Sequence, residues 1–280
     1  MDVLANFSLC GKVAVLTGAA GFFGRYFATA LLEAGVEMVY LLDKNLDGLI
    51  ELFKVLSDEK RPRPLNFQTI QVDQSNEQTT SRVFEQILAA GSVDILVNNS
   101  FQFGPLTGFN DPTGRVEMAS KGQVMASFES GAWWPFRATQ LVASAMKNKG
   151  SGSVVNIASM YGLVAPNPDL YEGRDYFNPI GYSLAKAALI AQTRYLAAWL
   201  GPEVRVNALA PGAIPNNESR SENSEQNKDE EFVQRLVART LLKRVGHPLD
   251  LVGPLIFLCS DASRYMTGQT VVVDGGWTTT

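Results

Sequence analysis

The stretch TGAAGFFG, from Thr17 to Gly24, follows the apolar run KVAVL and decides how the rest of the chain is interpreted. Its glycines Gly18, Gly21 and Gly24 fall three residues apart, directly after residues typical of a buried strand. Glycines at such a turn let backbone N–H groups and the beginning of the next helix come close to a phosphate. The stretch therefore predicts a strand, a phosphate-binding loop and a helix in succession.

Outward from this loop, short apolar runs alternate with longer amphipathic segments. Strands are expected at 12–17, 37–42, 67–72, 93–99, 153–159, 204–210 and 269–276, and helices at 24–34, 76–90, 122–147 and 182–200. Continuous apolar strands that alternate with helices are typical of a parallel sheet covered on both faces. We therefore predict an α/β protein, a single domain over residues 1–280 with a doubly wound, Rossmann-type sheet of seven parallel strands.

The composition excludes several other classes of protein. The chain has 280 residues, 46% of them hydrophobic, and a formal net charge of −4, so no basic surface for nucleic acid is expected. His247 is the only histidine, and Cys10 and Cys259 are the only cysteines, which argues against a zinc site and for reduced thiols in the cytoplasm. The first residues do not resemble a signal peptide, and no apolar run approaches the roughly 20 residues of a membrane span.

A carboxylate follows the second expected strand, at the sheet edge where doubly wound proteins bind their ligands. Asp43 comes 19 residues after Gly24. A carboxylate there can accept hydrogen bonds from a ribose 2′-hydroxyl and repels a 2′-phosphate, so NAD is favoured over NADP. Lys44 and Arg25 keep NADP open, because either could pair with a phosphate, and Asp43 could also cap the following helix.

Other residues near the expected strand ends are candidates for the same site. Asp73 could cap the next helix or meet an adenine, and the NNS stretch 98–100 could place amide groups beside a cofactor. Of Phe22 and Phe23, between the last two glycines, one is expected to pack beneath the helix and the other to face the cofactor or residues 100–101.

The sequence YSLAK places Tyr182 and Lys186 four residues apart, on one face of an expected helix. A phenol with a pKa of about 10 is a poor base at neutral pH, and a nearby ammonium stabilises the phenolate and lowers that pKa. The pair can therefore act as an acid or base. Ser159, just past the fifth expected strand, could donate a hydrogen bond to a substrate oxygen.

Taken together, these motifs resemble the short-chain dehydrogenase/reductase family over essentially the whole chain. The resemblance is carried, in order, by TGAAGFFG, NNS, NIAS, YSLAK, RVNALAPGAI and SRYMTGQTVVVDGGW. It implies that Tyr182 is the general acid or base, that Lys186 lowers its pKa and holds the nicotinamide ribose, and that Ser159 positions the reacting carbonyl or hydroxyl. The expected cofactor site comprises Gly18, Gly21, Phe22, Phe23, Gly24, Asp43, Asp73, Asn98, Ser100, Lys186, Pro211 and Gly212.

The family also implies a reaction and an assembly. The reaction is NAD(P)-dependent hydride transfer between C4 of nicotinamide and a secondary alcohol carbon. Members are usually dimers or tetramers, with the helix that begins near Tyr182 in an interface. We therefore expect a cytoplasmic homo-oligomer with a polar small-molecule substrate, no metal, and neither nucleic acid nor membrane as partner.

The chain departs from the usual family pattern in four places. The glycine spacing is GxxGxxG, as in the extended members that act on nucleotide sugars, where many single-domain members have GxxxGxG. In NNSF, Ser100 and Phe101 stand where the family usually has small residues, so we expect them to crowd that position. The family's catalytic asparagine is expected around ESGAW, residues 129–133, which contains no asparagine. Tyr182 comes 23 residues after Ser159, a longer interval than the family usually shows.

The longer interval predicts an active-site insertion at 160–181. We expect it to form a wall of the substrate pocket, with Tyr161 and Tyr176 stacking on the substrate and Arg174 gripping an anionic group. The insertion is similar to that of bacterial members associated with surface-sugar pathways, which favours a sugar or nucleotide sugar as substrate. The polar segment 213–231 follows the sixth expected strand and is predicted to be a lid loop.

Two other functions stay open at this stage. A nucleotide-sugar epimerase or dehydratase of the extended type would need a substrate domain after the sixth strand, where only 70 residues follow Ala210. A non-catalytic dinucleotide-binding protein would explain the missing asparagine, although Ser159, Tyr182 and Lys186 are all present.

Overall fold

One sheet organises the molecule. The computed structural model describes residues 3–57, 65–216 and 230–279. The strands are β1 (Val13–Thr17), β2 (Met38–Asp43), β3 (Phe67–Gln71), β4 (Ile95–Asn98), β5 (Gly152–Ile157), β6 (Val204–Pro211) and β7 (Thr270–Val273). All are parallel, in the order β3-β2-β1-β4-β5-β6-β7. The predicted fold class is confirmed, and each expected strand is found within a few residues of its expected range.

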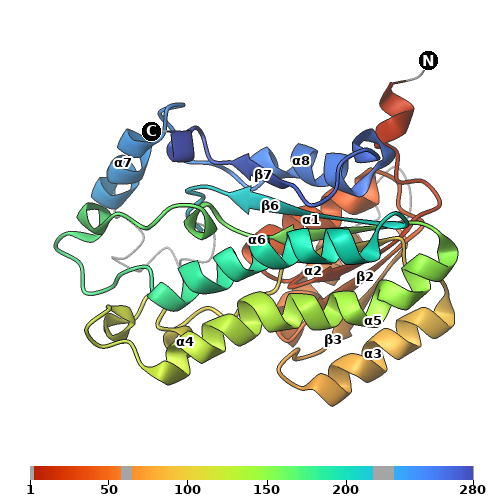
Figure 1. The fold of residues 1–280 in the computed structure, drawn as a ribbon, viewed down its shortest axis with the longest axis horizontal. Helices are drawn as coiled ribbons and strands as arrows, with labels where there is room; N and C mark the ends of the chain where they lie inside the picture. Colours follow the sequence, from red (N-terminus) through yellow and green to blue (C-terminus); the bar gives the residue numbers. More distant parts are fainter. Residues whose placement is uncertain (1–2, 58–64, 217–229, 280) are drawn as a thin grey trace.

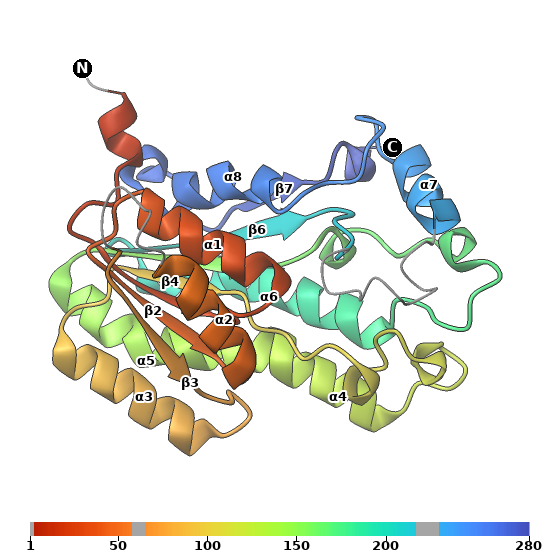
Figure 2. The same ribbon diagram turned by 180° about the vertical axis from the view of Figure 1, so that it is seen from behind.

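Helices cover both faces of this sheet (Figures 1 and 2). The helices are α1 (Phe22–Glu33), α2 (Leu46–Leu56), α3 (Glu77–Ala90), α4 (Lys121–Phe128), α5 (Trp134–Lys149), α6 (Ile180–Leu200), α7 (Glu230–Arg239) and α8 (Leu249–Cys259). One core cluster joins α1, α2 and α8 to the sheet, and a second joins α3, α5 and α6 to the other face. Within β1, Leu16 lies in the first cluster and Val15 in the second, as the alternation of a strand requires.

The helix expected at 122–147 is interrupted. Between α4 and α5, residues Glu129–Trp133 form a single π-helical turn, in which the backbone N–H of Trp134 donates to the carbonyl of Glu129. Pro135 follows at the beginning of α5 and has no N–H of its own to donate. The interruption coincides with the segment where the family's asparagine was expected.

The carboxyl ends of the strands, α7 and the insertion lie at one end of the molecule, on the left in Figure 1 and on the right in Figure 2. The insertion contains the 3-10 turns Met160–Gly162 and Pro168–Tyr171. Residues 217–229 of the expected lid lie outside the described residues, whereas Glu230 and Glu231 are helical and begin α7. None of the described helices combines the length and apolarity that a membrane span needs.

Candidate active site

The turn between β1 and α1 contains Gly18, Gly21 and Gly24, whose backbone atoms pack closely against neighbouring backbone; we call this turn the cradle. Gly18 has a φ of +66°, and a Cβ added there would lie 2.9 Å from the Cα of Ser100. A Cβ added to Gly24 would lie 2.0 Å from the carbonyl oxygen of Gly18. Helix α1 begins at the N-cap Gly21 with no side chain bonded to its first N–H groups. Open N–H groups at a helix beginning, behind a turn without side chains, fit a pyrophosphate.

The end of β4 closes one side of this cradle. Thr17 Oγ1 accepts the N–H of Asn99 at 3.1 Å and of Ser100 at 3.3 Å, and Asn99 Nδ2 donates to the carbonyl of Gly18 at 2.8 Å. Ser100 thus lies beside the turn, and so does Asn99, which belongs to the NNS stretch but was not among the individually predicted site residues.

Asn98 does not reach the cradle. Its Nδ2 donates to Asn156 Oδ1 at 2.8 Å and to Thr139 Oγ1 at 3.2 Å, inside the layer covered by α5. Successive residues at the end of a strand point to opposite faces, so only one of two adjacent asparagines can face the loop. We therefore correct the assignment of Asn98 to a structural role behind the site.

The two acidic residues past β2 and β3 are not the helix caps. Asp43 Oδ2 accepts the N–H of Ala20, in the glycine-rich turn, at 3.0 Å, and its Oδ1 accepts the N–H of Asn45 at 2.9 Å. The cap of α2 is Asn45, and the cap of α3 is Asn76. The capping alternatives for Asp43 and Asp73 are therefore wrong. Asp73 Oδ1 accepts the nearby N–H of Ser75, at 2.9 Å.

The two phenylalanines of the glycine-rich stretch, Phe22 and Phe23, lie in different surroundings. Phe23 packs against the first core cluster, with its ring 6.0 Å from that of Phe27, which is the position expected beneath the helix. Phe22 packs on Phe23 and on Tyr26, with ring centroids 5.4 and 6.4 Å apart.

Ser159, Tyr182 and Lys186 come together past the end of β5. Burial raises the pKa of the Tyr182 phenol, and its hydrogen bond with Ser159 opposes that rise. Lys186, 4% exposed, donates from Nζ to the carbonyl of Ile157 at 2.7 Å. Burial lowers the pKa of Lys186 to about 7. Its ammonium lies 5.7 Å from the centre of the Tyr182 ring, so the arrangement combines a phenol, a hydroxyl and a cation.

Aromatic side chains from the loop after β4 enclose this group. The Phe101 ring lies 5.1 Å from that of Tyr182, at 88°, and 5.2 Å from Lys186 Nζ. Phe109 and Phe103 add ring contacts to Tyr182 at 5.3 and 6.4 Å. Phe101, which was expected to crowd its surroundings, therefore packs against both Tyr182 and Lys186.

The π-helical turn makes room for Phe101. A Cβ added to Gly131 would lie 3.0 Å from the Phe101 ring and 2.8 Å from the Cβ of Ala185. Ser130 is buried and bonds back to the carbonyl of Ala126 at 2.9 Å. The segment that replaces the family's asparagine thus provides space for an aromatic ring.

The insertion forms an aromatic cluster that also includes Tyr182 and Trp277. Tyr161 and Tyr171 share a hydrogen bond, and burial raises the pKa of Tyr161 to about 12 and that of Tyr171 further. Tyr176 packs on Tyr171 with ring centroids 6.2 Å apart. Tyr161 thus lies in the same cluster as Tyr182, and its stacking on a substrate stays a prediction.

The third predicted substrate residue of the insertion faces α7. The guanidinium of Arg174 lies 5.0 Å from the centre of the Phe232 ring, and the Arg174 carbonyl accepts from the Arg115 guanidinium. Arg174 therefore links the insertion to α7 and to the loop that contains Arg115.

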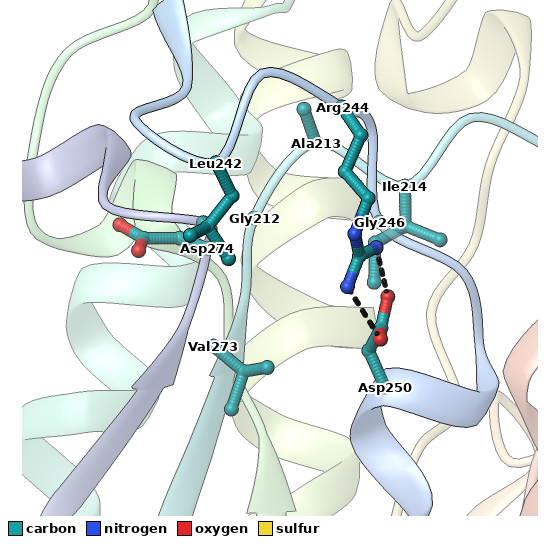
Figure 3. Close-up of a pocket in the computed structure, with 10 residues that line it drawn as sticks. Gly212, Ala213, Ile214, Leu242, Arg244, Gly246, Asp250, Val273 and Asp274 are labelled. Atoms are coloured by element: carbon teal, nitrogen blue, oxygen red, sulfur yellow. Dashed lines mark hydrogen bonds and ion pairs between the residues drawn. The ribbon is translucent and has the colours of Figure 1, made fainter. Parts of the chain in front are cut away.

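Pro211 is the last residue of β6, and the next residue, Gly212, helps to line a second concavity (Figure 3). Gly212 N–H donates to the Val273 carbonyl at 2.9 Å, and a Cβ on Gly212 would lie 2.4 Å from the Cα of Asp274. Arg244 and Asp250 form a two-bond ion pair at its wall, at 2.6 and 2.9 Å. The cavity of about 160 Å³ is not lined by Ser159, Tyr182 or Lys186.

Comparisons with known proteins agree with this geometry. The family model described as enoyl-(acyl carrier protein) reductase matches residues 18–278. The 2-dehydro-3-deoxy-D-gluconate 5-dehydrogenase of Dickeya dadantii is 32% identical over 98% of both chains. The 7alpha-hydroxysteroid dehydrogenase of Escherichia coli is 31% identical over 97% of this chain and 96% of its own. A gluconate 5-dehydrogenase from Burkholderia cenocepacia, solved with NADP and tartrate, aligns at a TM-score of 0.78, with 27% identity over 99% of both chains.

Proposed function

The chain belongs to the short-chain dehydrogenase/reductase family, and we propose that its substrate is a polar alcohol or ketone that carries several hydroxyl groups, such as a sugar or sugar acid. As a member it is an oxidoreductase that acts on a CH–OH group with NAD(P). The single observation that carries the proposal is the hydrogen bond between Ser159 and Tyr182 beside buried Lys186. Hydride transfer is the chemistry that a nicotinamide dinucleotide supplies when bound to the cradle of Gly18, Gly21 and Gly24.

The protein's own groups handle the proton and the orientation. Ser159 and Tyr182 are hydrogen-bonded to each other through their side chains, so both hydroxyls would contact the same substrate oxygen. Tyr182 would give that oxygen a proton in reduction and take it in oxidation, with Lys186 supplying positive charge near the phenolate. Phe101, Phe103 and Phe109 pack against the Tyr182 ring and would help to hold it in place beside the substrate.

The test is turnover by the purified protein with NAD or NADP against sugars, sugar acids, alditols and nucleotide sugars, followed by absorbance of the reduced nicotinamide. Tyr182→Phe should lower kcat by about 100-fold or more while the cofactor Kd changes by less than about threefold. Equal turnover in the variant would contradict the acid–base role. Turnover of a hydroxysteroid and of none of the sugars would indicate a steroid substrate and contradict the proposed polar one. No turnover of any substrate would favour a non-catalytic dinucleotide-binding protein.

We further propose that NAD is preferred, because Asp43 places a carboxylate beside Ala20 of the cradle. The NADP in the Burkholderia structure makes NADP the alternative. The protein is also proposed to work as a dimer or tetramer in the cytoplasm, where Cys10 and Cys259, both free, would stay reduced. The support for assembly is an exposed apolar stripe on α6, formed by Ile180, Leu184, Tyr195 and Trp199.

A further inference from the structure

Helix α7 is fixed against the insertion by one of its arginines. Arg235 Nη1 donates to the carbonyls of Asp169, Leu170 and Glu172, at 3.2, 3.3 and 2.9 Å. Arg239 lies four residues further, on the same face of the helix. The attachment of Arg235 therefore holds the face of α7 that carries Arg239 against the insertion.

Arg239 lies on the edge of the cluster that contains Tyr182. Its guanidinium carbon is 5.5 Å from the centre of the Trp277 ring, and Trp277 is 3% exposed within the cluster of Tyr161, Tyr171 and Tyr182. Burial raises the pKa of Tyr161, and the nearby positive charge of Arg239 opposes that rise. An exposed cation thus lies beside Trp277 and Tyr161, two members of the cluster against which Tyr182 packs.

The neighbouring cations are already engaged, whereas Arg239 pairs with no carboxylate among the described residues. Arg235 pairs with Glu231 at 2.7 Å, and Arg244 with Asp250. The carboxylate next to Trp277 is also occupied, because Asp274 accepts the N–H groups of Gly276 and Thr278, at 2.8 and 2.7 Å.

We propose that Arg239, stacked on Trp277, is the anchor for a carboxylate of the substrate, so that the enzyme selects sugar acids or other hydroxy acids over neutral polyols. A guanidinium held by its face on an aromatic ring keeps its N–H edge available for a two-bond contact with a carboxylate. The carboxylate would lie at Arg239 while a hydroxyl several carbons away meets Ser159 and Tyr182. The inference rests on the proposed dehydrogenase function and adds the charge of the substrate.

Two substrates that differ only in one end group test this directly. Gluconate and glucitol share their hydroxyl pattern, but only gluconate carries a carboxylate. Arg239→Met should raise KM for gluconate about 10-fold or more and leave kcat/KM for glucitol within about twofold; Arg239→Lys should fall between. The control is Lys243→Met, which removes a nearby cation bonded to the Ala238 carbonyl. Parallel losses for both substrates, or no loss, would overturn the inference.

A binding experiment separates this inference from the proposed function. Calorimetric titration of the enzyme–cofactor complex with tartrate, and with threitol as its neutral match, needs no turnover. We expect wild-type protein to bind tartrate at least about 10-fold more tightly than threitol, and Arg239→Met to remove that difference. Absence of tartrate binding to the wild type would refute the carboxylate anchor even if polyols are oxidised. Tartrate binding without any turnover would leave the anchor standing and count against the dehydrogenase.

Discussion

Asp43 accepts a hydrogen bond from the glycine-rich turn and is expected to select the cofactor, and a single substitution can separate these two roles. Its carboxylate holds Ala20 of the glycine-rich turn, and it lies where the adenosine ribose of a dinucleotide is expected. Asp43→Asn keeps one oxygen for Ala20 and removes the charge that repels a 2′-phosphate. We expect the ratio of the NADP Kd to the NAD Kd to fall about 10-fold, measured by fluorescence titration of NADH and NADPH. An unchanged ratio would restrict Asp43 to holding the turn.

Lys186 is a buried cation, and its environment predicts how the stability of the cofactor-free protein depends on pH. Burial lowers its pKa from 10.5 to about 7 in the folded state. Between these values the unfolded chain binds the additional proton, so stability rises as the pH increases through this window. Wild-type protein should therefore gain about 2 kcal/mol relative to Lys186→Met between pH 7 and pH 9, measured by urea unfolding at both pH values. A constant difference between the two proteins would mean that Lys186 keeps its ordinary pKa.

At the scale of elements, the strands could be predicted from the sequence, but the details of the connections between them could not. The apolar runs identify the central strands because strands such as β1 are covered on both faces. The break of the helix at 129–133 has no signal in hydrophobic periodicity, since it depends on packing between Gly131 and Phe101, 30 residues earlier. In the same way, the choice of Asn99 over Asn98 depends on which face of the sheet each residue meets.

The π-helical turn yields a prediction for Gly131. Alanine there would press its Cβ against the Phe101 ring and the Cβ of Ala185, so we expect about 1–3 kcal/mol of destabilisation and a lower kcat through displacement of Phe101 from Tyr182. The matched control is Gly122→Ala in α4, where the new Cβ would meet only Ser120 Oγ, at 3.7 Å. That change should be neutral or slightly stabilising in thermal unfolding. Similar effects of the two variants would show that the turn is not packed around Phe101.

At the scale of the whole molecule, the grouping of Ser159, Tyr182 and Lys186 was predictable, because YSLAK and Ser159 are local signals that the sheet brings together. The substrate side was only partly predictable. The sequence of the insertion predicted aromatic side chains near the site. Arg239, however, comes from α7, 53 residues beyond Lys186, and only the folded chain places it on Trp277. Phe103 and Phe109, likewise, gain their importance from contact with Tyr182 across the loop after β4.

The outer face of α6 predicts the assembly of the molecule. Leu184 is 48% exposed and Trp199 69% exposed, and Trp199 stacks on exposed Tyr195, with rings 6.4 Å apart and nearly parallel. Apolar side chains repeated along one face of a helix, without charges between most of them, are stabilised when a second copy covers them. Light scattering after size exclusion should therefore give a dimer or tetramer for the wild type, and Leu184→Lys combined with Trp199→Lys should lower the mass by at least half. Ile50→Lys, on exposed α2, is the control and should leave the mass unchanged. A monomeric wild type would contradict an interface on α6.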